Sequence, residues 1–369
     1  FPIVQQKLWE DGLDLGGGEA SDDAKSQKTK AKKAGQKSLE KNWTAPYIGN
    51  KWGGKYLRAP DIYWTILEKG KGKLVRLGDI AEVRFGIKTG ANEFFYLDQD
   101  KIDEWGIEEE FLKPVILHPA DIKKPIVDAD DLSTYLLVVD YPLNKLYGKK
   151  VKKYVKWGEQ QGFNATQTCR QRSTANTEWY QLKLRNPAEI ALPIVNKMRL
   201  VIGLNKAQAQ IDNNCVEIRI KGNRNSDTIA ALMIGSFNFI VRHIEGRNYG
   251  RMLKVQAYEA SRLLILDPFA LNATQTELLL NAFERIKYKG FKWLTEELNN
   301  PERLEFEMIW LKVHGFDSEN ARHKALSQIK EAVDSKSEEL NDQEKEWVKV
   351  RNFVRADGNP QDFMKRKGQ

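Results

Sequence analysis

The sequence predicts a mixed α+β fold, in which a strand-rich region is followed by a helical C-terminal region. Two patterns support this prediction. Between residues 43 and 268, short segments alternate apolar and polar residues or are continuously apolar, which is typical of strands. Between residues 269 and 369, apolar residues recur at the spacing of amphipathic helices. We therefore expect a strand-rich domain over 43–268 and a helical region over 269–369.

Residues 74–97 form the stretch around which the strand-rich domain is organised. An alternating segment, a polar segment with two glycines and a second apolar run follow one another, and the simplest interpretation is a β-hairpin. Gly86 and Gly90 permit backbone conformations closed to other residues, so Lys88 and Thr89 can project from a tight platform, with Asn92 just beyond. These side chains suit a polar, anionic ligand. An ordinary hairpin with a solvated tip would show the same pattern.

Further strands are predicted at residues 134–140, 200–204 and 215–221. The loop between the last two strands carries Asn205, Lys206 and Gln208. Amide side chains can pair with adenine, and Lys or Arg with guanine, so this loop is a candidate for base contacts. Any polar hairpin loop would look similar.

Helices are predicted at residues 60–67, 105–117, 144–157, 228–243, 274–287, 301–314 and 319–354, with a break at Pro114. One face of the 144–157 helix carries lysines, which usually only solvate a helix but can also follow a phosphate backbone. The last helix has an apolar seam with a seven-residue repeat. We expect the seam to pack on the chain's own domain, and a partner helix is the alternative.

Two loops carry arginines. Residues 166–179 are predicted to form a polar loop with Arg170 and Arg172. Residues 246–251 form a glycine-bracketed loop with Arg247, Asn248 and Arg251, and such a loop can bind a phosphate or a base edge.

Composition places limits on the class of protein. The 369 residues are 41% apolar and include ten tryptophans, which excludes wholesale disorder. The net charge of +8 favours polyanionic partners. Two cysteines and four histidines form no cluster at metal-ligand spacing, so no metal site is expected. Few cysteines, no secretory signal and no apolar run of membrane-spanning length predict a cytoplasmic protein that does not bind a membrane.

The N-terminal residues have a different composition. Residues 1–15 contain apolar residues without a clear period, and we expect them to be the tail of an upstream domain. Residues 16–42 are polar and lysine-rich after three glycines, which predicts a linker or insertion. Because the chain starts at a phenylalanine, we expect a fragment of a longer protein.

The segment RFGIKTGANEFF at residues 84–95 resembles the opening of the target-recognition domain of certain DNA adenine-N6 methyltransferases of restriction–modification and phage-defence systems. Later segments fit the same family in the same order: EWYQL at 178–182, PAEI at 187–190, LVI at 200–202, GRNYG at 246–250 and LILDP at 264–268. The resemblance covers roughly residues 55–268. It implies a module for sequence-specific recognition of double-stranded DNA. In this family that module follows the catalytic domain in the same chain.

The catalytic motifs of that family are missing from the sequence. Residues 186–189, NPAE, lack the second proline and the aromatic residue of the Asn/Asp-Pro-Pro-Tyr motif, and the glycines at 16–18 lead into a polar segment. We therefore expect no catalytic and no cofactor-binding residues in this chain. The resemblance implies that the parent enzyme uses S-adenosylmethionine and that its catalytic domain is a partner of this module.

Lysines and arginines would bind phosphates, while a few loop side chains would read base edges. The expected DNA contacts are Lys88, Thr89, Asn92, Arg170, Arg172, Asn205, Lys206, Gln208, Arg247, Asn248 and Arg251. A protein-interaction scaffold that recruits a partner through the C-terminal helix is an alternative. An RNA-binding module with stacking aromatics such as Trp52 and Tyr56 is another.

Overall fold

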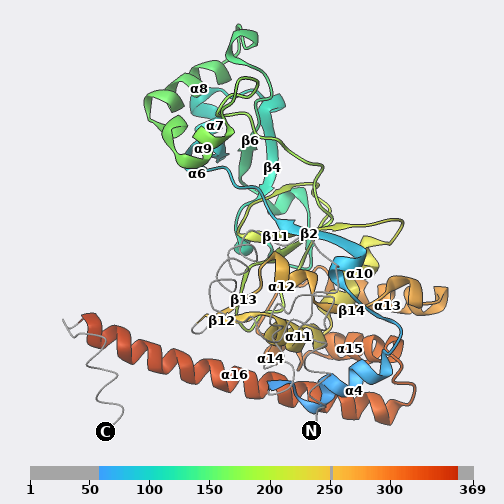
Figure 1. Ribbon diagram of the computed structural model, residues 1–369. Coiled ribbons are helices and arrows are strands. Elements are labelled where there is room, and N and C mark those ends of the chain that lie inside the picture. Colours follow the sequence, from blue (N-terminus) through green and yellow to red (C-terminus); the bar gives the residue numbers. More distant parts are fainter. Residues whose placement is uncertain (1–57, 250–251, 356–369) are drawn as a thin grey trace, which may run out of the picture.

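The computed structural model describes residues 58–249 and 252–355, which build a body and a smaller distal lobe joined by a narrower neck (Figure 1). The distal lobe comprises residues 91–117 and 133–184, and its core is rich in aromatic side chains. The body comprises the other described residues and has the largest apolar core. A third apolar cluster, which includes Ile116 and Ile211, fills the neck.

The body holds a sheet whose described strands have the order β2-β11-β7-β9-β5. Neighbouring strands are antiparallel except β9 and β5, which are parallel. The strands span Ala81–Phe85 (β2), Cys215–Ile220 (β11), Ile190–Pro193 (β7), Gly203–Asn205 (β9) and Ile126–Val127 (β5). Smaller antiparallel pairings join β1 (Leu74–Arg76) to β14 (Leu264–Leu266), and β13 (Met252–Lys254) to both β12 (Arg247–Tyr249) and β8 (Val195–Asn196).

The distal lobe is built on a second sheet, with the order β10-β4-β6-β3. Its strands are Gln210–Ile211 (β10), Leu112–Ile116 (β4), Tyr135–Leu137 (β6) and Tyr96–Leu97 (β3). Strand β10 pairs in parallel with β4, so residues that follow a strand of the body sheet extend the sheet of the lobe. Figure 1 shows the short helices of the lobe around this sheet: α6 (Asn92–Phe95), α7 (Gln99–Trp105), α8 (Val151–Gln160) and α9 (Gln167–Arg172).

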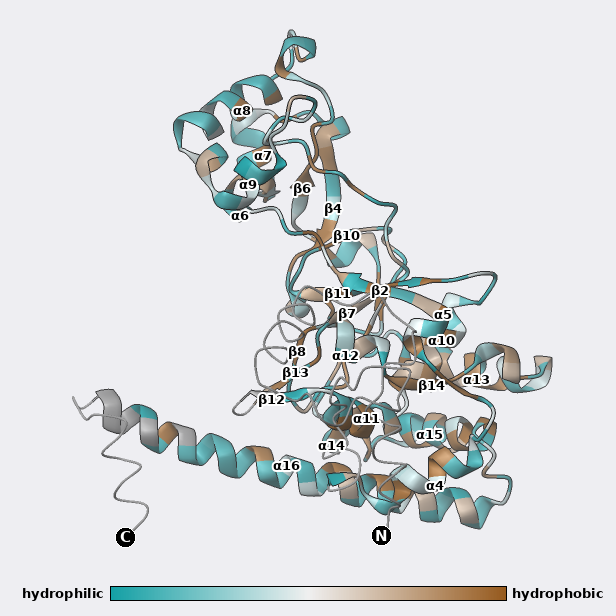
Figure 2. Cartoon of the chain, viewed as in Figure 1, coloured by the Kyte–Doolittle hydropathy of each residue, from teal (hydrophilic) through white to brown (hydrophobic). Residues whose placement is uncertain are grey.

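Helices form most of the lower body in Figure 1. They are α4 (Asp61–Lys69), α5 (Leu77–Ile80), α10 (Ser226–Ile234), α11 (Phe237–Glu245), α12 (Ala257–Ser261), α13 (Ala273–Ile286), α14 (Leu294–Glu297), α15 (Pro301–Val313) and α16 (Glu319–Arg355). Short 3-10 turns occur at Glu109–Phe111, Pro119–Asp121, Ala129–Asp131, Leu143–Lys145, Phe163–Ala165 and Pro268–Ala270. Helix α16 runs along the base and projects beyond it, and Figure 2 shows its surface as mostly hydrophilic. No helix in the described ranges is long and apolar enough to span a membrane.

The α+β class is confirmed, as are the elements with the clearest local periodicity. Helices α4, α13, α15 and α16 begin and end within two residues of their predicted bounds. Strands β6 and β11 lie inside the predicted strands, and β9 overlaps the predicted strand at 200–204. The predicted helix at 144–157 starts later, at Val151, but buries its predicted apolar face and leaves Lys153 and Lys156 exposed. In the seam of α16, Val333 and Leu340 are buried in the body core.

The predicted hairpin over residues 74–97 is wrong. Strand β2 pairs with β11 and strand β3 pairs with β6, so the two runs belong to different sheets. The segment between them leads from the body into the distal lobe. Alternation of apolar and polar residues indicates which face of a strand is buried, but it does not indicate which strand is its neighbour. The hairpin was predicted wrongly for this reason.

Two predicted helices are also corrected. Residues 106–117 form no α-helix, because α7 ends at Trp105 and Gly106 adopts a left-handed conformation (φ +60°). After a 3-10 turn at Glu109–Phe111 the chain continues into β4, which includes Pro114. Residues 228–243 form two helices, α10 and α11. A Cβ at Gly235 would lie inside the indole of Trp310, so the close approach of this indole requires the glycine between them.

Two predicted loops also differ from the structure. Residues 166–179 include helix α9, and residues 247–249 form strand β12. Within the described ranges, the helices after residue 268 share one core with α4, α10 and α11. The predicted segments 1–15 and 16–42, together with Trp52, Tyr56 and the side chains of Trp347 and Val354, lie outside the described residues.

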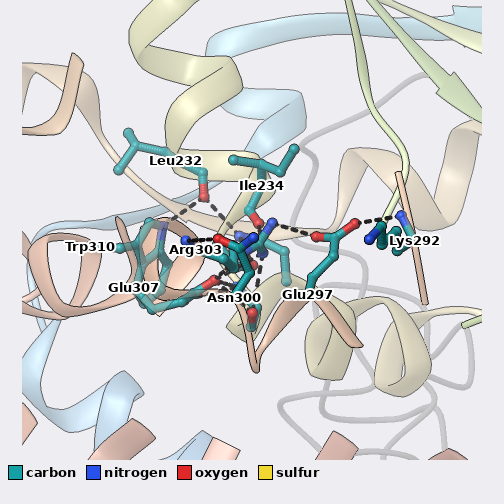
Figure 3. Close-up of polar contacts among 11 residues, drawn as sticks. Leu232, Ile234, Lys292, Glu297, Asn300, Arg303, Glu307 and Trp310 are labelled. Carbon is teal, nitrogen blue, oxygen red and sulfur yellow. Dashed lines mark hydrogen bonds and ion pairs between the residues drawn. The ribbon is translucent and has the colours of Figure 1, made fainter. Parts of the chain in front are cut away.

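A buried polar network holds the break between α10 and α11 (Figure 3). Glu307 accepts hydrogen bonds from the backbone N–H and the hydroxyl of Ser236, at 3.0 and 2.6 Å. Arg303 donates to Glu307 (2.9 Å), to Glu297 (2.8 Å) and to the carbonyl of Ile234 (2.6 Å). Arg303 and Glu307 are 5% and 0% exposed. Each charge therefore depends on the other for compensation, and together they satisfy the backbone groups freed by the helix break.

We expect Arg303→Met to lower the free energy of unfolding by about 3–5 kcal/mol, because it leaves the Glu307 carboxylate buried without its cation. The matched control is Arg285→Met, whose partner Glu305 lies on the surface, and its loss should stay below about 1 kcal/mol. Urea titrations monitored by circular dichroism measure both values. Equal losses in the two variants would show that burial of the Arg303–Glu307 pair has no special importance.

His314 ends α15 in the apolar core. Its ring stacks on Trp310 at 3.4 Å between centroids, and Nδ1 donates to the Trp310 carbonyl at 2.7 Å. Burial lowers the pKa of His314 to about 3. The imidazole is therefore neutral in the fold but takes up a proton in the unfolded chain below pH about 6.5. Its contribution to stability is complete above that pH and is lost as the pH falls toward 3.

We expect His314→Phe to flatten the dependence of unfolding free energy on pH. For one such histidine, the slope approaches about 1.4 kcal/mol per pH unit below pH 6.5, and the variant should lose that share. Urea titrations at intervals between pH 5 and 7.5 measure the slope. His323→Phe, at an exposed position on α16, should leave it unchanged. An unaltered slope in His314→Phe would mean that this imidazole is not held neutral by burial.

Candidate nucleic-acid interface

The segment that leaves β2 is bound tightly to the chain that enters β11. The N–H of Ile87 donates to the carbonyl of Ile211 at 2.7 Å, and the N–H of Asn213 donates to the carbonyl of Ile87 at 3.1 Å. Gly86 donates to the carbonyl of Cys215 at 3.1 Å. A Cβ at Gly86 would collide with two backbone carbonyls of residues 211 and 212, so only glycine allows this approach.

Asp212 links this crossing to the distal lobe. Its carboxylate accepts a hydrogen bond from the Tyr96 hydroxyl at 2.5 Å and another from the N–H of Asn214 at 2.8 Å. Asp212 is 1% exposed. Burial, reinforced by the hydrogen bond to this carboxylate, raises the pKa of Tyr96, so the phenol stays neutral and remains a donor. Strand β3 is thereby joined to the neck by a side-chain contact as well as by the chain.

Lys88, Thr89 and Asn92 follow the crossing, as the sequence suggested, but they differ in accessibility. Lys88 and Asn92 are exposed, whereas Thr89 is 1% exposed and donates to Oδ1 of Asn92 at 2.5 Å. Arg172 donates to the carbonyls of Thr89 (2.6 Å), Lys88 (3.3 Å) and Trp179 (2.8 Å). Burial lowers the pKa of Arg172, which nevertheless remains a cation at neutral pH. Thr89 and Arg172 therefore shape this turn more than they face solvent.

The predicted base-contact loop at 205–210 has a mainly structural geometry. Asn205 is 2% exposed, and its amide donates to the carbonyls of Ala188 and Ala209 and accepts from the N–H of Ala209. Lys206 pairs with Asp227 at 2.7 Å. Only Gln208 is exposed without a described partner. Because β9 and β2 lie toward opposite edges of the body sheet, this loop is not brought together with Lys88.

The remaining predicted contacts are dispersed. Arg170 is exposed on α9 in the distal lobe. Arg247 is held in the body by Glu259 at 2.6 Å and by Oε1 of Gln256 at 3.0 Å. The side chain of Asn248 and all of Arg251 lie outside the described residues. For the predicted residues, DNA contact therefore stays a prediction, and Lys88, Arg170 and Gln208 are the exposed ones for which the structure describes no side-chain hydrogen bond or ion pair.

Two hollows at the neck share Lys88 as a lining residue. The first, which we call the amide hollow, has a volume of about 460 Å³. Its lining contains Phe85, Lys88, Asn213, Asn214, Lys254 and Gln256, with Ile194 and Val195 beside them. The second, the cationic hollow, has a volume of about 310 Å³ and contains Lys88, Arg172 and Lys183 beside Ile87 and Leu182. Amides and cations therefore gather on both sides of one exposed lysine.

The lysines of these hollows are available for a ligand. No described side chain pairs with the ammonium of Lys88, Lys183 or Lys254, and no carboxylate lines either hollow within the described residues. An uncompensated cluster of cations in a concave surface attracts anions. The described residues also contain no group of His, Cys, Asp and Glu that could hold a metal ion.

Sequence reasoning missed Lys183, Asn213, Asn214, Lys254 and Gln256. Their positions depend on pairings between distant segments, because β13 lies beside β8 (Lys254 opposite Val195) and β7 lies beside β11. The one local signal was the pair Asn213 and Asn214 directly before β11, and the same pair is common in an ordinary turn.

Comparison with known proteins identifies the family. Residues 49–298 match the family model described as Type II methyltransferase M.Eco57I, C-terminal domain. This match covers more than half of the chain. The chain belongs to this family of methyltransferase C-terminal domains.

Two relatives agree with this assignment. The C-terminal domain is 24% identical over 245 residues to Type II methyltransferase M.AccI of Acinetobacter calcoaceticus, which covers 62% of this chain and 44% of M.AccI. The chain therefore spans less than half of that relative. The crystal structure of the type IIG restriction endonuclease BpuSI shares its fold with a TM-score of 0.55, at 12% identity, over 79% of this chain and 34% of BpuSI.

We expect Gly86→Ala to destabilise the C-terminal domain by about 1–3 kcal/mol, because the added methyl group must displace backbone that is hydrogen-bonded on both sides. Amide exchange at Ile87 and Asn213 should accelerate more than exchange in α15. Gly290→Ala, where the nearest atom would lie at 3.8 Å, should change neither value. Unchanged exchange at Ile87 in the Gly86 variant would show that the crossing tolerates a side chain.

Proposed function

We propose that this C-terminal domain recognises a specific sequence in double-stranded DNA, as the specificity module of an S-adenosylmethionine-dependent DNA adenine-N6 methyltransferase. The observation that carries the proposal is the concave surface at the neck, where lysines without a described ion-pair partner line the same hollow as three amide residues. Membership in a family of methyltransferase C-terminal domains supports it.

The two kinds of side chain suit the two tasks of such a module. Lys88, Lys183 and Lys254 would bind phosphates, which provides affinity and fixes the register of the protein on the duplex. Asn213, Asn214 and Gln256 would contact base edges, where a bidentate amide favours adenine. Their amides are held close to a rigid backbone crossing, so little side-chain freedom is lost on binding.

Methyl transfer is assigned to the catalytic domain of the parent enzyme. A methyl-donor site of the usual nucleotide-binding kind needs a glycine-rich turn at a helix start and a carboxylate for the ribose. The described lining of the two hollows offers neither, so they do not fit S-adenosylmethionine. In this proposal the C-terminal domain holds the duplex while the target adenine is turned out toward that catalytic domain.

The test is selection of bound sequences from a pool of randomised 25-base-pair duplexes, over several rounds at two salt concentrations. We expect one short motif to be enriched and to survive the higher salt. Lys88→Ala and Lys254→Ala should weaken binding to all duplexes and reduce the salt slope by about one each, because each removes a phosphate contact. Asn213→Ala should instead relax the motif at one position, at a cost of about 1–3 kcal/mol for the selected base.

The matched control is Lys324→Ala, at an exposed position on α16 in the lower body, which should leave affinity and salt slope unchanged. Binding without any enriched motif would contradict sequence-specific recognition. No binding at low salt would favour the protein-interaction alternative.

A further inference from the structure

An exposed aromatic ring forms part of the amide hollow. Phe85 ends β2 and is 46% exposed, and Val195 beside it is 42% exposed. This apolar ring is only partly covered by its own fold, in a hollow whose lining also includes amides and lysines. A flat π-face among hydrogen-bonding groups is, however, what a nucleobase requires for stacking.

The polar groups of the amide hollow are already arranged as a donor and an acceptor. Asn214 donates through Nδ2 to the carbonyl of Leu117 at 3.1 Å, which leaves its Oδ1 to accept. Gln256 accepts through Oε1 from Arg247 at 3.0 Å, which leaves its Nε2 to donate. The edge of a nucleobase presents one donor and one acceptor side by side, so both remaining groups would find partners.

The two hollows together have the size and charge for one nucleotide. The amide hollow, at about 460 Å³, lies within the range of roughly 300–1,000 Å³ that is usual for small-ligand sites. The cationic hollow lies on the other side of Lys88 and adds Arg172 and Lys183. A base in the first hollow would therefore place its phosphate near Lys88, at the rim of the second.

A base stacked within a duplex offers its edges, so stacking on the ring face of Phe85 requires a base that has left the stack. We propose that the amide hollow holds one unstacked nucleotide of the bound DNA, with its base against Phe85 and its phosphate between Lys88 and Lys183. This inference rests on the proposed function, and it assigns to this domain a nucleotide site separate from the catalytic domain that takes the target adenine.

Binding to four fluorescein-labelled 25-base-pair probes of one sequence tests the inference: fully paired, with one bulged adenosine, with one bulged thymidine, and with one bulged abasic residue. We expect the nucleotide bulges to bind at least tenfold more tightly than the paired duplex, because a bulged base has no pairing partner to lose when it unstacks. The abasic bulge should lack this advantage. Phe85→Ala should abolish the preference, and Phe85→Trp should retain it.

Phe269→Ala is the matched control, because Phe269 is 64% exposed on the body and lines neither hollow. A direct readout is photocrosslinking from a bulged 5-iodouridine, with the modified peptide identified by mass spectrometry. The proposal expects the crosslink at Phe85, with loss of that product in Phe85→Ala.

The outcomes separate the inference from the proposed function. Binding of the paired duplex without any preference for a bulge overturns the nucleotide site and leaves duplex recognition standing. A bulge preference that persists in Phe85→Ala, or a crosslink outside the lining of the amide hollow, overturns the site as well. Binding of the bulged probes without any binding of the paired duplex supports the site and contradicts duplex recognition. Absence of binding to all four probes at low salt overturns both.

Discussion

The backbone crossing at Gly86 and Ile87 is the constraint on which the rest of the structure depends. At this point the chain leaves the body sheet, bonds to the residues that lead into β11, and enters the distal lobe. The buried Asp212 carboxylate bonds to Tyr96 of the lobe and to the backbone of Asn214 in the neck. Several buried polar groups therefore depend on partners within the neck, and together these groups specify its geometry.

The body provides a rigid base for this crossing, because its helices share one core with the sheet. The Arg303–Glu307 pair satisfies the backbone at the break between α10 and α11, and the close approach of Trp310 to Gly235 determines where that break lies. A buried ion pair of this kind adds little net stability compared with an apolar replacement, but either charge alone would be costly. Its effect is to select one arrangement of α10, α11 and α15, and that arrangement supports the strands below the neck.

Local sequence patterns predicted the α+β class and most helices, because periodicity records which face of an element is buried. The long helix α16 and the helices α13 and α15 followed directly from such patterns. Strand pairing was not accessible in this way, and β2 and β3 were joined into a hairpin although they belong to different sheets. The same limit applied to the site. Lys88 was recognised from its neighbouring glycines, whereas Lys254 and Asn213 come together only through long-range pairing.

Net charge also gave an incomplete guide to the interface, because most candidate cations have partners within the fold. Lys206 pairs with Asp227, Arg247 with Glu259, and Arg172 with three carbonyls. Only the cations that have no such partner are available to bind an anionic ligand.

In the neck, the same residues make hydrogen bonds through their backbone and line the two hollows. The carbonyl of Lys88 accepts from Arg172, and Lys88 also lines both hollows. The N–H of Asn213 donates to Ile87, and Asn213 also lines the amide hollow. Because the architecture depends on the backbone groups, substitution of these side chains leaves its hydrogen bonds in place. A surface built in this way can change its side chains without a matching loss of stability.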